Sequence, residues 1–489
     1  LEQAQAAGRG SLAAEARLAW WHGPVSEAKQ TLERFFNALA LLLSEHQTQH
    51  HGGGPRSWSE GVEPSLRLQP KIRNTPAWKG VEQAWDELEK ALLPLLSHLE
   101  RLVTLLGGPA PAADDHERPA QSRKATRLST LADLSPVPSD EAAALAGELK
   151  GICFRLGEWA EQGRLAITQP RGGMVYWVRP PLPPPPPRAA SSITTPPPAD
   201  APPAMPTLHA APILAGSLLQ RTVFRHDRAA ALVSSVLQVN GDFDYVAERL
   251  GLPAGRAAAL SVAPEQQPQS LLYLPEDVAE PNTHHYQKHL DAMLTQLATM
   301  LNGETVALFA SHAALRAGYA GVKAALEERG ILVLAQGIDG SIHQLWQTFR
   351  SQKRVVLLAA VNTWDTVDLP GERPACVVVT RLPFPALSDP PLAGRAEVYH
   401  DQLHQFVIPQ ASLRLRQALN RLSWSGGAGP QAPAEGTRRN AIVLFDKRVL
   451  AKDYGPVFLS SMPQCTVRQG SVSVLPEQVA GWIRGESLE

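Results

Sequence analysis

Short apolar runs alternate with helical segments throughout the second half of this chain, and this alternation limits the possible folds more than any other feature. The runs are RAAALVSSVL (228–237), SLLYLPED (270–277), TVALFASH (305–312), GILVLAQG (330–337), RVVLLAAV (354–361), ACVVVTRL (375–382) and NAIVLFDK (440–447). Amphipathic patterns such as HYQKHLDAMLTQLATML (285–301) separate several of them. Continuous apolar strands joined by helices predict an α/β fold, with a parallel sheet covered by helices on both faces.

The first third of the chain has a different pattern. Residues 12–47, 76–107 and 141–163 carry apolar residues at helical spacing, and Leu88, Leu92, Leu95 and Leu99 form one stripe. These segments predict an antiparallel helical domain, and MVYWVRP (174–180) predicts a strand that returns to a sheet. The proline-rich stretch 180–206 predicts an extended tether or a disordered loop, in preference to a ligand for an SH3-like partner.

Composition excludes several classes of protein. The net charge is −1, so no overall positive field indicates a nucleic-acid partner, although a locally basic groove remains compatible with one. Cys153, Cys376 and Cys465 are too few and too scattered to hold an iron–sulfur cluster. No apolar run of about 20 residues is present, which predicts a soluble, cytoplasmic protein with no membrane contact. The histidines of HQTQHH (46–51) lack a nearby glutamate, so we expect no zinc site there.

Five blocks in the last third occur in a recognisable order: LFASHAAL (308–315), LAQGIDGS (334–341), LLAAVNTWDTVDLPG (357–371), VVVTRLPFPALSDP (377–390) and IPQASLRLRQALNRL (408–422). Together they resemble the second motor domain of the DinG/XPD-type superfamily 2 DNA helicases, most closely the DinG branch. The resemblance implies a RecA-like lobe over 251–489. It further implies a helical arch-like domain over 1–170 and a partial first lobe over 171–250, interrupted by the linker 180–206. The implied activity is ATP-dependent DNA unwinding with 5′→3′ polarity.

The same resemblance implies a set of contacts to single-stranded DNA. Ser311 and His312 follow a strand, where α/β sheets present their ligands. Gln336 follows the next strand, Trp364 could stack on or pack beneath DNA, and Ser234 lies in VSSVL where the family has TSATL. The alternative for Ser311 is a serine that caps the following helix.

A second set is implied for the nucleotide. Gln417 and Arg421 match the family's QGxGRxxR block, and Asp365 and Asp368 match its FWEGVD block, where they would orient the arginines. The second arginine of the family falls on Trp424, which predicts impaired turnover. Arg381 and the DKR segment at 446–448 also match the family, and we expect them to be structural.

The 489 residues contain no GxxxxGK[ST] loop and no DEAH-like box. ATP and Mg²⁺ therefore need first-lobe motifs from elsewhere in the same protein or from a companion chain, and this chain alone is predicted not to hydrolyse ATP. Since the chain begins at Leu1, we expect it to be the C-terminal portion of a helicase, with a sheet edge and apolar surface exposed. Two alternatives remain open: a stand-alone module that binds single-stranded DNA without ATPase activity, and a remnant that acts as a scaffold.

Overall fold

The computed structural model describes most of the chain. The described residues are 21–50, 65–106, 139–181, 205–225, 229–234, 236–252, 257–262, 270–281, 283–360, 374–423, 439–462 and 465–486. They divide into two compact units: one runs through Ala211, and the other begins at Pro212. The proline-rich stretch expected to be a tether lies almost entirely outside the described residues.

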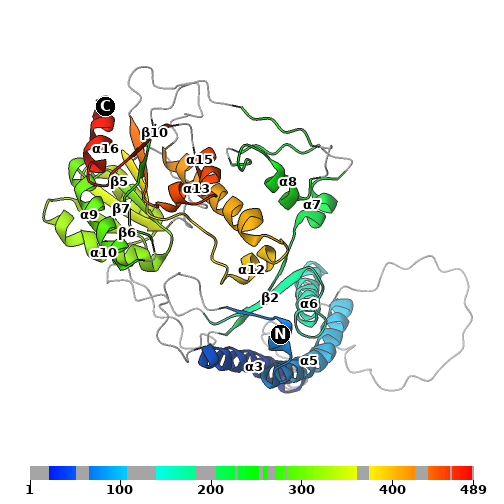
Figure 1. Cartoon of the computed structure of the whole chain (residues 1–489). Coiled ribbons are helices and arrows are strands. Elements are labelled where there is room, and N and C mark those ends of the chain that lie inside the picture. The colour runs from blue at the N-terminus through cyan, green and yellow to red at the C-terminus, as the bar shows by residue number, and fades with distance from the viewer. Residues whose placement is uncertain are drawn as a thin grey trace, which may run out of the picture. The chain divides into compact units, whose positions relative to one another are not determined.

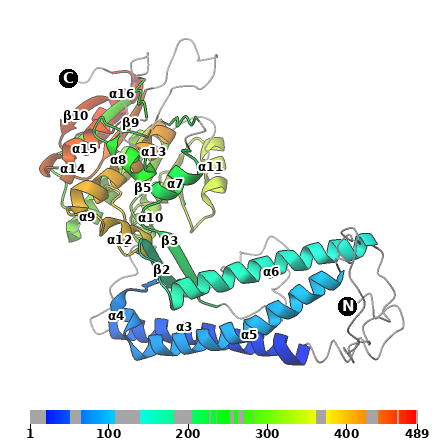
Figure 2. The ribbon, with the colours of Figure 1, turned by 90° about the vertical axis from the view of Figure 1, so that its right-hand side faces the viewer.

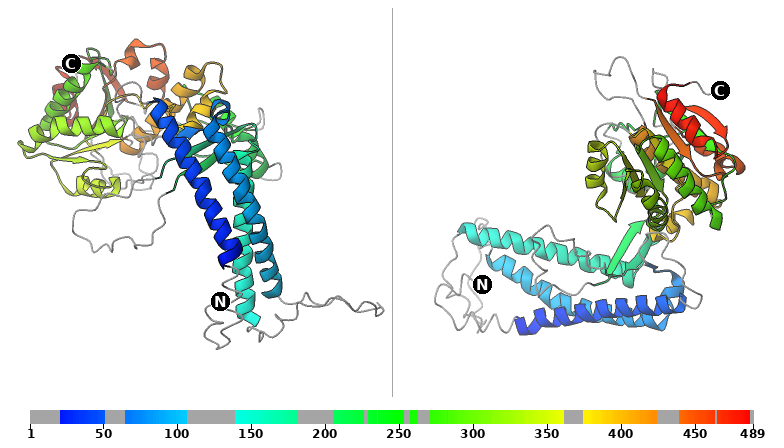
Figure 3. Two further views of the ribbon diagram at one scale, coloured as in Figure 1. Left: turned by 90° about the horizontal axis from the view of Figure 1, so that it is seen from below. Right: turned by 90° about the vertical axis from the view of Figure 1, so that its left-hand side faces the viewer.

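Three long helices dominate the first unit: α3 (Ser26–His50), α5 (Pro76–Leu106) and α6 (Ser139–Ile167). They lie alongside one another in Figures 2 and 3. Arg34 pairs with Glu87 at 2.6 Å and Arg164 with Glu89 at 2.5 Å. Buried Trp78 and Trp85 belong to the core between the helices. The three predicted helices are present: α5 and α6 end within about four residues of the predicted bounds, and residues 12–20 of the first predicted segment lie outside the described residues.

Smaller elements complete this unit. The π-helix η1 (Trp21–Val25) precedes α3, and α4 (Pro70–Arg73) precedes α5. The strands β1 (Leu66–Arg67), β2 (Met174–Arg179) and β3 (Thr207–Pro212) form a sheet in that order. β2 is the strand predicted from MVYWVRP. Its Tyr176 and Val178 belong to the helical core, so the sheet is packed on the helices.

The second unit is built on a seven-stranded sheet with the order β10-β4-β9-β8-β5-β7-β6. Every pairing in it is parallel. The strands, labelled in part in Figure 1, are β4 (Ser270–Pro275), β5 (Thr305–Phe309), β6 (Leu332–Ala335), β7 (Val355–Ala360), β8 (Cys376–Val379), β9 (Asn440–Leu444) and β10 (Thr466–Gly470). The parallel sheet predicted from the sequence is confirmed.

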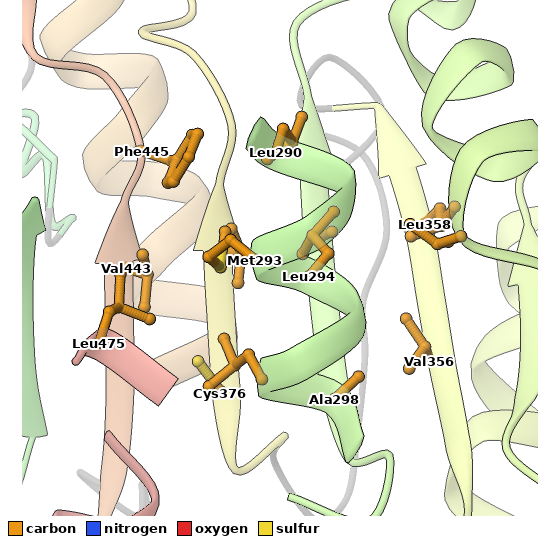
Figure 4. Packing of buried hydrophobic residues seen from close by; sticks show 14 of the residues in the cluster. Leu290, Met293, Leu294, Ala298, Val356, Leu358, Cys376, Val443, Phe445 and Leu475 are labelled. Atoms are coloured by element: carbon orange, nitrogen blue, oxygen red, sulfur yellow. The ribbon is translucent and has the colours of Figure 1, made fainter. Parts of the chain in front are cut away.

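Helices cover both faces of this sheet. One core contains residues from α9 (His284–Met300), α10 (His312–Glu327) and α16 (Leu475–Arg484). Figure 4 shows part of it, with Leu290, Met293 and Leu294 of α9 against the strands. The core on the other face contains residues of α11 (Ile342–Ser351), α13 (Ile408–Ser423), α14 (Arg448–Ala451) and α15 (Gly455–Ser460). Alternate residues of each strand enter opposite cores, which explains why the strands are apolar throughout.

The remaining elements of this unit are α7 (Gly216–Thr222), α8 (Asp244–Leu250), α12 (Pro390–Ala396) and the π-helix η3 (Leu403–Val407). The prediction of a strand at RAAALVSSVL is wrong for the described residues, because 229–234 and 236–238 have no strand assignment. Val233 there is 94% exposed. A strand needs a neighbour to bond its backbone groups, and the described residues give this segment none. β10 is a strand that the apolar pattern missed, because its residues are mostly exposed.

Candidate functional site

The carboxyl ends of the parallel strands meet at one edge of the sheet, here called the carboxyl edge. Because β5 lies between β8 and β7, the residues that follow these three strands are neighbours there. Ser311 and His312 follow β5 and open α10, as the sequence placed them. The Ser311 hydroxyl oxygen accepts from the backbone N–H of Ala314 at 3.2 Å, so Ser311 caps the helix. Its own O–H remains a donor at a helix N-terminus, where anions bind readily.

His312 is half-buried at the same helix terminus. Burial, with the nearby positive charge of Arg316 as the second cause, holds the pKa of His312 below its usual value. His312 is therefore predominantly neutral at pH 7. In that form the imidazole can donate one hydrogen bond to a phosphate oxygen, but it brings no charge.

Gln336 lies at the carboxyl edge after β6, but its side chain is only 8% exposed. Its carbonyl Oε1 accepts from the backbone N–H of Ala360 at 3.0 Å, which fixes the end of β6 to the end of β7. The loop after it is held by Asp339, whose Oδ2 accepts from the N–H of Ala335 at 2.8 Å. Ser341 then opens α11 with a capping box shared with Gln344. The Gln336 amide thus shapes this loop, and the predicted DNA contact of Gln336 stays a prediction.

Trp364, Asp365 and Asp368 lie outside the described residues, within 361–373. Ser234 is described and exposed, and its hydroxyl oxygen accepts from the N–H of Val236 at 3.2 Å. The segment around Ser234 forms no strand of the sheet, so the strand order does not place Ser234 at the carboxyl edge as it does Ser311 and Gln336.

Gln417 and Arg421 lie in the second half of α13. A helix that connects two parallel strands runs antiparallel to them, so the end of α13 points toward the amino ends of the strands. Gln417 is partly exposed, and the side chain of Arg421 is outside the described set. Arg416 directly precedes Gln417, and burial lowers the pKa of Arg416. The predicted nucleotide residues on α13 are therefore separate from the carboxyl edge.

A buried ion pair stands at the end of β9, and sequence reasoning gave it only a structural role. Asp446 has no exposed side-chain surface and lies 2.6 Å from the guanidinium of Arg448. Its Oδ1 accepts from the Nε and backbone N–H of Arg448, at 2.9 and 3.1 Å. Its Oδ2 accepts from Arg448 Nη2 and from the N–H of Leu382, at 2.6 and 2.9 Å. Asp446 thereby joins the end of β9 to the loop after β8.

Tyr286, in the first turn of α9, is a residue of this edge that the sequence analysis did not indicate. Its hydroxyl donates to the backbone carbonyls of Thr380 and Phe445. Burial raises the pKa of Tyr286 far above its usual value, which keeps the hydroxyl protonated and able to donate. The guanidinium carbon of Arg381 lies 4.7 Å from the centre of the Tyr286 ring. Tyr286 therefore supports both strand ends and one cation at the carboxyl edge.

The described residues do not offer a complete site for ATP and Mg²⁺. Among them, no group of three or more His, Cys, Asp and Glu side chains could hold a metal ion. The residues available for a nucleotide are the polar and cationic side chains of α13, which can contact phosphate but cannot cradle it. Within the same described set, no helix combines the length and apolar character needed to cross a membrane.

Comparison with known proteins finds a family match within the second unit. Residues 294–465 match the helicase C-terminal domain family. This range runs from α9 to the residue before β10 and contains Ser311, His312, Gln336, Gln417 and Arg421. This part of the chain is therefore similar to helicase C-terminal domains, and it contains the strands β5 to β9 of the parallel sheet.

More specifically, the chain is similar to proteins named DinG and YoaA. The chain is 27% identical over 291 residues to the 3′-5′ exonuclease DinG of Bacillus subtilis, covering 56% of this chain and 29% of that protein. It is 27% identical over 261 residues to the ATP-dependent DNA helicase YoaA of Escherichia coli, covering 53% and 39%. A solved XPD helicase structure, 13% identical, covers 76% of this chain and 61% of that one with a TM-score of 0.43. The chain spans well under half the length of these two curated relatives.

Proposed function

We propose that this chain is the C-terminal portion of an ATP-dependent DNA helicase that unwinds DNA with 5′→3′ polarity. Its α/β unit binds single-stranded DNA along the carboxyl edge through Ser311 and His312, with Gln336, Trp364 and Ser234 as further contacts. The observation that carries the proposal is the placement of Ser311 and His312 at the N-terminus of α10, within the matched helicase domain. Backbone N–H groups and the helix dipole favour phosphate there.

On the nucleotide side, we propose that Gln417 and Arg421 contact ATP, with Asp365 and Asp368 orienting the arginine. The spacing of four residues between Gln417 and Arg421 supports this role, because it places both on one face of α13. Mg²⁺ and the phosphate cradle come from motifs that these 489 residues do not contain.

The surface of the second unit supports a need for a further segment, in the same protein or in a companion chain. Val233 is 94% exposed, Leu260 is 85% exposed and Val262 is 90% exposed. All three lie in segments with neither helix nor strand assignment. Large apolar side chains exposed to this degree are typical of surfaces that another protein segment covers. We propose that the Walker-bearing lobe covers them. The arch-like domain over 1–170, the partial first lobe over 171–250 and the second lobe over 251–489 remain part of this proposal.

The first test measures single-strand binding and ATP hydrolysis by the chain alone. We expect binding of an oligothymidylate and no DNA-stimulated hydrolysis. Hydrolysis stimulated by DNA would show that this chain needs no other lobe. Absence of binding would remove the DNA contact and leave the scaffold alternative.

The second test uses Arg421→Ala in a protein that also contains the Walker-bearing lobe. An arginine finger contributes roughly 10³–10⁵ in rate. We therefore expect ATPase activity to fall to background while DNA binding persists. Arg350→Ala, on the last turn of α11, is the control because Arg350 is exposed and is not among the residues proposed to contact ATP. Full ATPase activity in the Arg421 variant would make the finger assignment wrong.

A further inference from the structure

We infer that Arg381 is the phosphate-binding cation of the carboxyl edge, and that Tyr286 is the positioning residue that holds it there. This inference rests on the proposed DNA binding and assigns a ligand to a residue that the sequence pattern marked as structural. The ligand class is a phosphodiester of single-stranded DNA.

The location of Arg381 follows from the register of β5 and β8. Leu308 pairs with Val379, and the N–H of Thr380 donates to the carbonyl of Leu308 at 3.0 Å. Arg381 is the next residue, so it leaves β8 beside the chain that leads from β5 to Ser311. Neighbouring strands lie about 4.8 Å apart, which places Arg381 next to the N-terminus of α10.

The charge of Arg381 is available to a ligand. Among the described residues, no ion pair joins Arg381 to a carboxylate. Its guanidinium lies over the ring of Tyr286. Asp446, the carboxylate at the end of β9, already accepts five hydrogen bonds from Arg448 and Leu382. A partly exposed guanidinium at the carboxyl edge, without an acidic partner in the described set, is suited to bidentate binding of phosphate.

The geometry also explains why arginine is needed at this point. His312 beside it is predominantly neutral at pH 7, because burial and Arg316 lower its pKa. Ser311 offers only a hydroxyl. Arg381 therefore supplies a permanent positive charge at the end of β8, and Ser311 and His312 supply neutral donors.

Tyr286 fixes the position of the guanidinium. Its ring is 1% exposed and lies 4.7 Å from the guanidinium carbon. Its hydroxyl is held by the carbonyls of Thr380 and Phe445. The guanidinium therefore rests on a ring whose orientation is fixed. This stacking limits the positions that the N–H groups of Arg381 can take.

The test compares salt dependence in three variants of the full chain: Arg381→Met, Arg381→Lys and Arg350→Met. Binding of a fluorescent oligothymidylate is followed by anisotropy between about 50 and 200 mM salt. Losing one phosphate contact reduces the log–log salt slope by about 0.7 for single strands. We expect that loss for Arg381→Met, an unchanged slope with weaker binding for Arg381→Lys, and no change for Arg350→Met, which removes a charge at the opposite edge of the sheet.

A second probe, inorganic tripolyphosphate, separates this inference from the proposed function. We expect it to raise the melting temperature of the wild-type chain and not that of Arg381→Met. Oligothymidylate binding with the same salt slope in Arg381→Met would overturn the role of Arg381 and leave the proposed function standing. No oligothymidylate binding, with tripolyphosphate stabilisation that depends on Arg381, would remove the DNA ligand and keep the phosphate site. Absence of both effects would overturn the inference and the DNA contact together.

Discussion

The ends of β8 and β9 each carry an arginine close to the same edge of the sheet, but the two guanidinium groups have opposite surroundings. Arg448 is bound by the fully buried Asp446, over the ring of Phe384. Arg381 rests on Tyr286 and has no carboxylate partner among the described residues. An arginine at a strand end can therefore be paired with a carboxylate within the fold, as Arg448 is, or keep its charge available to a ligand, as we propose for Arg381. The difference lies in where the carboxylate is, and not in the arginine itself.

The largest expected effect is on the side of Arg448. Asp446→Ala leaves the half-buried Arg448 without its counter-ion and the N–H of Leu382 without its acceptor. Removing one member of a buried pair costs about 3–5 kcal/mol of unfolding free energy. Urea denaturation of the variant measures this loss, with Asp453→Ala as the exposed-carboxylate control. A loss below about 1 kcal/mol, the range of surface ion pairs, would mean that Asp446 does not hold Arg448 in the fold and that the two arginines do not differ in this respect.

Tyr286→Phe has the next largest expected effect. It separates the contribution of Tyr286 to stability from its role in positioning the guanidinium of Arg381. The variant leaves the carbonyls of Thr380 and Phe445 without their donor, at a cost of about 1–3 kcal/mol. The ring beneath Arg381 is retained, so affinity for an oligothymidylate should change little under folded conditions. A loss of affinity as large as that in Arg381→Met would mean that the hydroxyl, and not the ring, positions the guanidinium.

Ser311→Ala is expected to have a smaller effect on both properties. Loss of the cap on α10 costs about 1 kcal/mol of stability. Ser311→Gly is the matched variant, because glycine is tolerated at an N-cap and removes the hydroxyl. If Ser311 only caps the helix, the Gly variant binds DNA like the wild type. If its hydroxyl donates to phosphate, both variants lose affinity.

The smallest effect is a pH dependence at His312. Its folded pKa is lowered, so the fold disfavours the charged form, and stability falls as pH decreases below the unfolded value near 6.5. The same protonation adds a charge beside Arg381 and should tighten single-strand binding as pH falls. Both trends should disappear in His312→Gln. Binding that tightens equally in that variant would assign the titration to another group.

Much of the α/β unit could be predicted from the sequence, because six apolar runs coincide with strands that are buried on both faces. RAAALVSSVL is similarly apolar, but its described residues form no strand, since composition does not show whether a neighbouring strand is present. Ser311 and His312 were placed at a strand end by position alone. The stack of Arg381 on Tyr286 could not be foreseen. It depends on contact between segments 94 residues apart, measured from Tyr286 to Thr380, and on a buried tyrosine that looks like any core aromatic in α9.

The loop that follows Arg381 is attached at several points soon after it begins. The backbone N–H of Leu382 donates a hydrogen bond to Asp446. Pro383 and Pro385 are buried, and Phe384 packs edge-on against Tyr454 and Phe458. Proline and buried aromatic residues have few conformations to lose. The backbone around Arg381 is consequently ordered during folding, so a ligand does not have to order it. Binding at this edge should therefore carry a small entropic penalty for the protein, and most of the ordering should occur in the DNA.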